Sequence, residues 1–123
     1  MPYLDHLTIF VRDLARSREW YTAALGLKVE FEVPAHHATA LQDSGGFTLF
    51  LEQRPREQCT PSCVVTFRVD AVDSAYERLV QNGIGFERPP QKLFWGYGAE
   101  LRDPDGYLIR LWDEVSMREK GGA

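Results

Sequence analysis

The chain has 123 residues, 44% of them hydrophobic and 26% charged, with 14 Lys and Arg against 18 Asp and Glu. This length suits one domain, or two very small modules that share a core. The composition is typical of a folded globular protein and excludes a disordered chain. The net charge of −4, with no basic run, argues against a nucleic-acid-binding protein, because nucleic acids require a concentrated positive surface.

The sequence offers no segment for membrane insertion or export. No apolar run approaches the roughly 18–20 residues that cross a bilayer. Residues 1–14 lack the basic start and the small-residue cleavage site of a signal peptide. We therefore expect a cytoplasmic protein with no membrane partner. Cys59 and Cys63 lack the second ligand pair of a zinc site, so we interpret them as two reduced thiols.

The first half of the chain predicts a strand, a helix and three further strands. Residues 5–11 carry apolar side chains on both faces, which indicates a strand. Asp13 is a good N-cap for a helix that Gly26 ends. Three strand-like runs follow, and the turn at residues 43–46 between the last two is rich in turn-forming residues. These runs are residues 28–33, 36–42 and 47–52.

The second half returns to the same order of elements after a proline-bearing polar segment, residues 54–62, which predicts a linker. We expect Asp70 to cap the second helix and Gly83 to end it. A loop over residues 89–98 precedes the last hairpin, whose turn is residues 103–106. The strands predicted in this half are residues 64–69, 84–88, 99–102 and 107–114.

The two halves align with a nearly constant offset. His6 and Val11 align with Val64 and Val69 at a shift of 58 residues, and the two last turns align at a shift of 60. Such a period indicates a duplicated structural unit, neither half of which could bury a core alone. The expected organisation is a single domain over residues 1–123, with modules 4–53 and 63–114, a linker at 54–62 and a flexible tail at 115–123.

This doubled unit resembles the vicinal oxygen chelate superfamily, which includes glyoxalase I, extradiol dioxygenases and bleomycin resistance proteins. The resemblance covers roughly residues 4–114 and is carried by DHLTIFVRDLARSREWYTAALGLKV, VDAVDSAYERLVQNGI and DPDGYLIRL. It implies an α+β fold in which two βαβββ modules form a curled eight-stranded mixed sheet around a cavity, with the helices outside. It also implies a small-molecule partner and a homodimer.

Side chains alternate along each strand, so one face must pack under the helices while the other lines the expected cavity. Leu7, Ile9 and Val11 belong to the helix-covered face. The loop before the penultimate strand holds three aromatic residues, Phe94, Trp95 and Tyr97, whose rings either cap a flat ligand or dock on a second subunit. The expected ligand-binding residues are His6, Phe10, Phe50, Glu52, Thr66, Trp95, Glu100, Leu108, Arg110 and Trp112.

Metal-dependent members of the superfamily hold a divalent ion at four positions, which correspond here to His6, Phe50, Val64 and Arg110. Of these only His6 can ligate, because Phe50 and Val64 offer no lone pair and Arg110 is permanently positive. We therefore predict no cofactor and no metal at the usual site. A relocated divalent-metal site stays an alternative, with ligands from among His6, Glu52, Glu100 and His36.

Arg110 requires an anionic partner if it points into an apolar-walled cavity, since an unpaired buried charge is costly. Glu100, on the adjacent antiparallel strand, is the nearest candidate by register. Two interpretations remain open. The pair is either a structural ion pair that replaces the metal, or a site where Arg110 binds an anionic group of a ligand.

These observations favour a small-molecule-binding protein of the bleomycin-resistance type that lacks the usual metal and takes a flat or anionic ligand. One alternative is a glyoxalase-like lyase or dioxygenase with relocated metal ligands. A metal-free enzyme would use His6 with Glu52 or Glu100 for acid–base catalysis, and His6 and Glu100 are the catalytic candidates. Another alternative is a dimeric interaction protein whose cavity is filled by large side chains.

Overall fold

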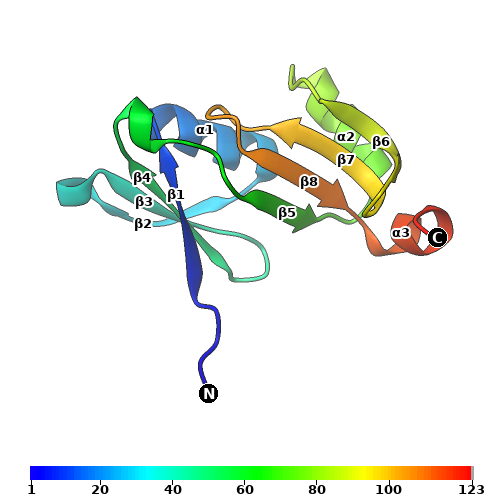
Figure 1. Ribbon diagram of the computed structural model, residues 1–123, viewed down its shortest axis with the longest axis horizontal. Helices are drawn as coiled ribbons and strands as arrows, with labels where there is room; N and C mark the ends of the chain where they lie inside the picture. Colours follow the sequence, from blue (N-terminus) through cyan, green and yellow to red (C-terminus); the bar gives the residue numbers. More distant parts are fainter. Residues whose placement is uncertain (123) are drawn as a thin grey trace. The chain divides into compact units, whose positions relative to one another are not determined.

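The computed structural model describes residues 1–122 and contains two compact units, Met1–Thr60 and Pro61–Ala123 (Figure 1). The boundary between these N-terminal and C-terminal units falls inside the predicted linker. Each unit contains a four-stranded mixed sheet and a helix that packs on it. The α+β class with two βαβββ modules is therefore confirmed. In the part of the chain that the structure describes, no helix has the length and apolar character needed to cross a membrane.

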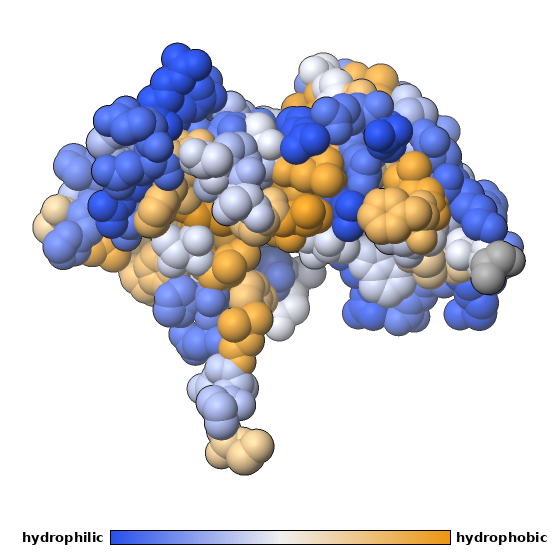
Figure 2. All heavy atoms as spheres, viewed as in Figure 1, coloured by the Kyte–Doolittle hydropathy of each residue, from blue (hydrophilic) through white to orange (hydrophobic). Residues whose placement is uncertain are grey.

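The N-terminal unit has strand order β1-β4-β3-β2, with β1 parallel to β4 and the other pairs antiparallel. Helix α1 packs on β3 and β4. The segment before β1 exposes apolar side chains (Figure 2), among them Leu4, which is 78% exposed. The elements are β1 (His6–Val11), α1 (Leu14–Leu25), β2 (Lys28–Val33), β3 (Ala38–Gln42) and β4 (Thr48–Gln53), with short 3-10 helices at Pro34–His36 and Arg56–Gln58.

The C-terminal unit repeats this topology in the order β5-β8-β7-β6, with β5 parallel to β8. The offsets predicted from the sequence are present in the register, because His6 pairs with Thr48 as Val64 pairs with Leu108. Helix α2 packs on β6 and β7. The elements are β5 (Val64–Arg68), α2 (Val72–Gln81), β6 (Arg88–Leu93), β7 (Gly96–Arg102), β8 (Leu108–Trp112) and α3 (Glu114–Lys120).

Burial alternates as predicted along β4, β5 and β8 and in the second half of β1. Ile9 and Val11 are buried in the N-terminal unit, and Ile109 and Leu111 are buried in the C-terminal unit. Leu7, expected on the same covered face as Ile9, is instead 36% exposed. Leu7 is the second residue of β1, where it pairs with Leu49 of β4, and it follows the exposed segment at residues 1–5. The alternation leaves the opposite face of each sheet to the candidate ligand residues.

Helix α1 begins and ends at the predicted residues. The Asp13 carboxylate accepts a hydrogen bond from the backbone nitrogen of Arg16 at 3.1 Å. Gly26 ends the helix with φ of +71°, a conformation that glycine adopts without steric cost.

The predicted strand at residues 84–88 and the predicted loop at 89–98 are both wrong. Strand β6 begins at Arg88 and forms a hairpin with β7 through a turn at Phe94 and Trp95. Pro89 and Pro90 fall at a register shift on this edge strand. A proline cannot donate to the sheet, and edge positions and bulges are where that loss is tolerated.

Two helix predictions also differ from the structure. Ala71, rather than Asp70, is the N-cap of α2, and the first backbone nitrogen of the helix, that of Val72, donates to the Asp113 carboxylate at 2.7 Å. The cap is thus supplied from a residue 41 positions away, which a local pattern cannot reveal. The segment expected to be a flexible tail contains α3, whose N-cap is the same Asp113.

The strand predicted at residues 36–42 begins only at Ala38. His36 lies in a 3-10 helix that Pro34 starts, and His37 has φ of +49°. Both imidazoles are exposed. His36 is therefore not on a strand face, contrary to the expectation from the sequence.

Candidate ligand site around Glu100

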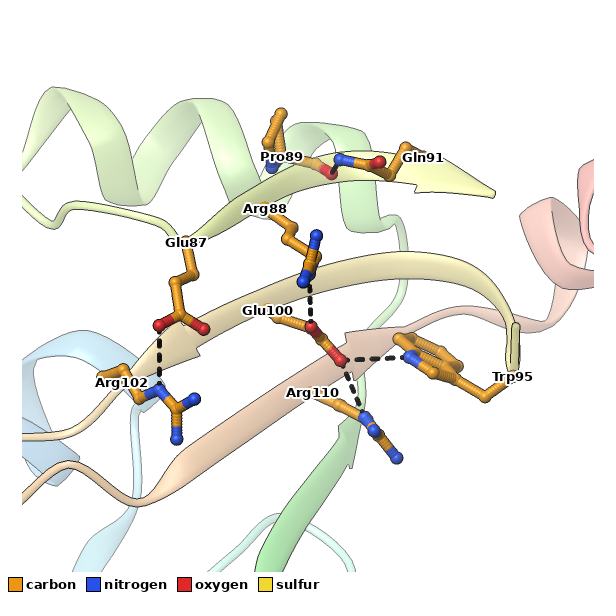
Figure 3. A network of polar contacts seen from close by, with 8 residues as sticks. All are labelled: Glu87, Arg88, Pro89, Gln91, Trp95, Glu100, Arg102 and Arg110. Atoms are coloured by element: carbon orange, nitrogen blue, oxygen red, sulfur yellow. Dashed lines mark hydrogen bonds and ion pairs between the residues drawn. The ribbon is translucent and has the colours of Figure 1, made fainter. Parts of the chain in front are cut away.

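Glu100 lies in the middle of β7 and is only 6% exposed. Its Oε1 accepts a hydrogen bond from Nε of Arg88 at 3.1 Å. Its Oε2 accepts from Nε of Arg110 at 2.9 Å and from Nε1 of Trp95 at 3.1 Å. The expected pair of Arg110 with Glu100 is present, within a larger network (Figure 3). We refer to Arg88, Trp95, Glu100 and Arg110 as the Glu100 cluster.

The sheet register brings the charged members of this cluster together. Glu100 is the direct partner of Arg110 across β7 and β8, and of Arg88 across β6 and β7. Three neighbouring strands thus place a carboxylate between two guanidinium groups. Cross-strand neighbours of opposite charge stabilise a sheet at such positions.

Trp95 reaches Glu100 because β7 carries a glycine where the indole ring lies. A Cβ atom on Gly98 would be 2.3 Å from Cη2 of Trp95 and 2.3 Å from the backbone oxygen of Leu111. Only glycine leaves this space open, and the indole N–H then points at the carboxylate (Figure 3). Gly98 therefore helps to place the aromatic member of the cluster.

The surroundings of Glu100 hold its carboxylate in the charged form. Burial raises the pKa of Glu100, but hydrogen bonds from Arg110, Trp95 and Arg88 outweigh that effect, and the pKa is lowered overall. Two guanidinium groups face one carboxylate, so the cluster carries one excess positive charge. An excess cation at a partly buried position attracts an anionic group.

Arg110 is the member of the cluster best placed to meet a ligand. Its bond to Glu100 uses Nε, and its terminal nitrogens extend away from the carboxylate (Figure 3). Its guanidinium carbon lies 5.4 Å from the ring centre of Phe94 and 5.3 Å from that of Trp95, within cation–π range. Phe94 is 90% exposed, so this aromatic ring is accessible from solvent.

The other predicted ligand residues of the C-terminal unit share the face of Arg110. Thr66 is its partner across β5 and β8, and Leu108 and Trp112 lie two residues before and after it on β8. Thr66 is exposed, and Leu108 and Trp112 are partly buried. One strand face therefore presents a hydroxyl, a guanidinium and apolar surface next to one another.

The remaining predicted residues form a second group in the N-terminal unit. The rings of His6 and Phe50 meet edge to face at 4.9 Å, and Nδ1 of His6 lies 2.9 Å from Oδ2 of Asp5. Phe10 lies under the guanidinium of Arg54, which also donates from Nε to Glu52 at 2.8 Å. That these residues join Arg110 in one site stays a prediction.

Sequence reasoning missed Arg88 as a partner of Glu100. The two prolines after it are typical of a loop, and a local pattern does not reveal that this segment pairs with β7. The sequence does hold one signal for this pairing, a possible two-residue turn at Phe94 and Trp95. Such a turn pairs Leu93 with Gly96, and the hairpin then extends back along the chain to Arg88.

A family model for the Glyoxalase/Bleomycin resistance protein/Dioxygenase superfamily matches residues 3–111. The chain belongs to this superfamily. Among the curated proteins it is 24% identical over 122 residues to the uncharacterized protein YetH of Bacillus subtilis (strain 168), a match that covers 85% of this chain and 92% of that protein.

Solved structures of the superfamily share this fold. TnmS3, an antibiotic binding protein from Streptomyces sp. CB03234, matches with a TM-score of 0.76 and 24% identity over 92% of this chain and 96% of that one. A possible glyoxalase from Bacillus cereus matches with a TM-score of 0.73 and 25% identity over 89% of this chain and 97% of that one.

The residues at the superfamily's metal positions do not fit a divalent ion. Phe50 and Val64 supply no donor atom, and the guanidinium of Arg110 is already bonded to Glu100. Between residues 1 and 122, no group of three or more His, Cys, Asp and Glu side chains has an arrangement that could hold a metal. A relocated metal site therefore gains no support from this donor set.

Proposed function

We propose that the chain binds a small, flat, anionic molecule at the Glu100 cluster without using a metal ion. The observation that carries this proposal is the hydrogen-bonding geometry of Arg110. Its terminal nitrogens extend away from Glu100, while two guanidinium groups share that one carboxylate. A carboxylate or phenolate could accept hydrogen bonds from these nitrogens, and its ring could stack on the adjacent aromatic side chains.

Membership of the superfamily supports a small-molecule partner, and one of the similar solved structures is an antibiotic binding protein. Fold alone does not choose the ligand, because one fold supports many functions. The charge and the aromatic rings of the cluster supply the chemical preference for a flat anion.

Binding, rather than acid–base catalysis through Glu100, agrees with the hydrogen bonds of this carboxylate. Its two oxygens accept three hydrogen bonds, and its pKa is lowered. A group held in this way is a weak proton acceptor at neutral pH. We assign Glu100 the role of orienting Arg110 and Trp95.

The proposal extends to the N-terminal unit and to a second copy of the chain. We propose that His6, Phe10, Phe50 and Glu52 also bind ligand, and that the protein is a cytoplasmic homodimer. Phe31, next to Phe50, is 46% exposed and offers apolar surface for such contacts. Sedimentation of the purified protein at the mass of two chains is the expected result, and a single-chain mass contradicts the dimer.

The test of function compares a flat anion with a neutral molecule of the same shape. We expect 2-naphthoate to bind and 2-naphthamide to bind more weakly in calorimetric titrations. Arg110→Gln should weaken 2-naphthoate binding by at least about tenfold, because a hydrogen bond to a charged group contributes about 1.5–3 kcal/mol.

Arg102→Gln is the matched control. Arg102 also pairs with a glutamate on the neighbouring segment, through Nε to Glu87 at 3.1 Å, but both partners are exposed. We expect this variant to bind 2-naphthoate as the unmodified protein does. Equal affinity for acid and amide, or an Arg110→Gln variant that binds normally, contradicts the proposed function.

A further inference from the structure

Helix α3 lies beyond residue 111, where the match to the superfamily model ends. It packs against β7, the strand that carries Glu100. The role inferred for α3 rests on the proposed function, because it concerns how the ligand site at the Glu100 cluster is held in place.

Two contacts join α3 to Tyr97 at the start of β7, and two more join Tyr97 and α3 to Asp73 of α2. The backbone nitrogen of Tyr97 donates to Sδ of Met117 at 3.4 Å. The hydroxyl of Tyr97 donates to Asp73 of α2 at 3.0 Å, and Nζ of Lys120 lies 3.5 Å from the same carboxylate. Lys120 also lies 5.0 Å from the ring centre of Tyr97. Tyr97 is thus held by side chains from both helices.

The sulfur of Met117 packs against two glycines. A Cβ atom on Gly96 would be 2.2 Å from Sδ, and one on Gly121 would be 2.6 Å from it. These distances are far shorter than any non-bonded contact, so the thioether occupies space that only glycine leaves open. Met117 is partly buried, and its sulfur packs against the two glycines and the Tyr97 nitrogen.

This sulfur lies beside the turn that carries Trp95. Gly96 follows Trp95 in the chain, and Tyr97 follows Gly96. The same hairpin turn positions Phe94 and Trp95 around Arg110, and the Trp95 indole donates to Glu100. Met117 is therefore connected to the turn that holds Trp95 through the backbone of Tyr97 and Gly96.

We propose that α3 is a latch over the start of β7, and that oxidation of Met117 by a peroxide opens this latch and weakens ligand binding. A lone pair on Sδ attacks one oxygen of the peroxide, and the S–O bond forms as the O–O bond breaks. The second oxygen leaves as hydroxide and takes the proton of the hydroxyl now bound to sulfur, which yields the sulfoxide and water. Sulfur is oxidised by two electrons and the peroxide is reduced. The sulfoxide is larger and more polar than the thioether and no longer fits between the glycines.

The test compares the unmodified protein with Met117→Leu before and after treatment with hydrogen peroxide. Leucine nearly conserves the volume of methionine and cannot be oxidised. Met1 and both cysteines are present in both proteins, so a difference between them reports Met117. Peptide mass spectrometry verifies that Met117 has gained one oxygen.

We expect oxidation to weaken 2-naphthoate binding by at least about fivefold in the unmodified protein, and to leave Met117→Leu unchanged. Methionine sulfoxide reductase should restore the affinity. If Met117→Leu does not fold, this reversal decides the question in the unmodified protein.

Hydrogen exchange at the Tyr97 amide gives a readout that needs no ligand. This amide should be protected in the unmodified protein and exchange faster once Met117 is oxidised. If 2-naphthoate does not bind the untreated protein, the proposed function is contradicted. The Tyr97 exchange rate then still tests whether α3 acts as a latch. If Met117 is oxidised and the Tyr97 exchange rate stays the same, α3 is not a latch. If exchange becomes faster but the affinity for 2-naphthoate stays the same, the latch does not affect the ligand site.

Discussion

Glu100 and Ala40 occupy equivalent positions in the two units, yet their surroundings differ in chemical kind. Ala40 pairs across its strands with Phe50, and both are apolar. Glu100 pairs with Arg110 and is buried as a charge. A buried carboxylate is tolerated only where donors replace its water, and Glu100 has three such donors.

The lowered pKa of Glu100 predicts how stability responds to pH. A carboxyl group whose pKa is lower in the folded state contributes its full stability above the unfolded-state pKa of about 4.3. That contribution is lost as the pH falls through the lower folded-state value. Glu100→Gln should therefore reduce the free energy of unfolding by about 2 kcal/mol at pH 7, and by progressively less under acid conditions.

Urea unfolding of Glu100→Gln and of the unmodified protein at several pH values checks this expectation. Glu87→Gln is the control, because Glu87 pairs with Arg102 where both side chains are about half exposed. Such a surface pair is worth about 0–1 kcal/mol. A destabilisation by Glu100→Gln that stays constant down to acid pH would show that its charge does not cause the effect.

Elements set by local signals were predicted well, and those set by distant contacts were not. Helix α1 follows from a cap and a terminating glycine within its own sequence. The α2 cap comes instead from Asp113, and β6 becomes a strand through its pairing with β7 despite Pro89 and Pro90. Local patterns carry no information about such partners, so the sequence predicted the Glu100–Arg110 pair but not Arg88.

Asp113 fastens two helices at once, which makes it more sensitive to substitution than Asp13, the cap of α1. Its two carboxylate oxygens accept from the backbone nitrogens of Val72 and Ser116, each at 2.7 Å. Burial raises the pKa of Asp113, but these backbone hydrogen bonds outweigh that effect and lower it. Asp113→Ala should reduce the free energy of unfolding by about 1–4 kcal/mol, since it removes two caps and each contributes about 0.5–2 kcal/mol.

The matched control for Asp113→Ala is Asp13→Ala, which removes the exposed cap of a single helix. We expect about 1 kcal/mol for this change, measured by denaturant unfolding of both variants. Equal losses for the two variants would mean that the bond from Asp113 to α2 adds no stability.

At the scale of the whole molecule, the chain is a duplication whose halves have kept their topology while their central residues diverged. Both sheets have the same strand order, and the register offsets follow from the sequence. The sequence therefore predicted the superfamily and the face on which the candidate residues lie. It could not predict how Trp95 folds back over Gly98, because that depends on a turn between strands not recognised as a hairpin.

This divergence predicts a protein whose stability and ligand response are independent of metal. The four superfamily positions hold one imidazole, a phenyl ring, an aliphatic side chain and a guanidinium, a donor set that cannot enclose a divalent ion. We expect elemental analysis to find less than stoichiometric transition metal, and EDTA to leave the melting temperature unchanged.

A ligand that binds only the folded state stabilises it by about 2.7 kcal/mol at one hundred times its Kd. The rise in melting temperature with 2-naphthoate should therefore be the same before and after EDTA treatment. A melting temperature that falls with EDTA and recovers with an added divalent ion would show that a metal binds at this site and that Arg110 does not replace it.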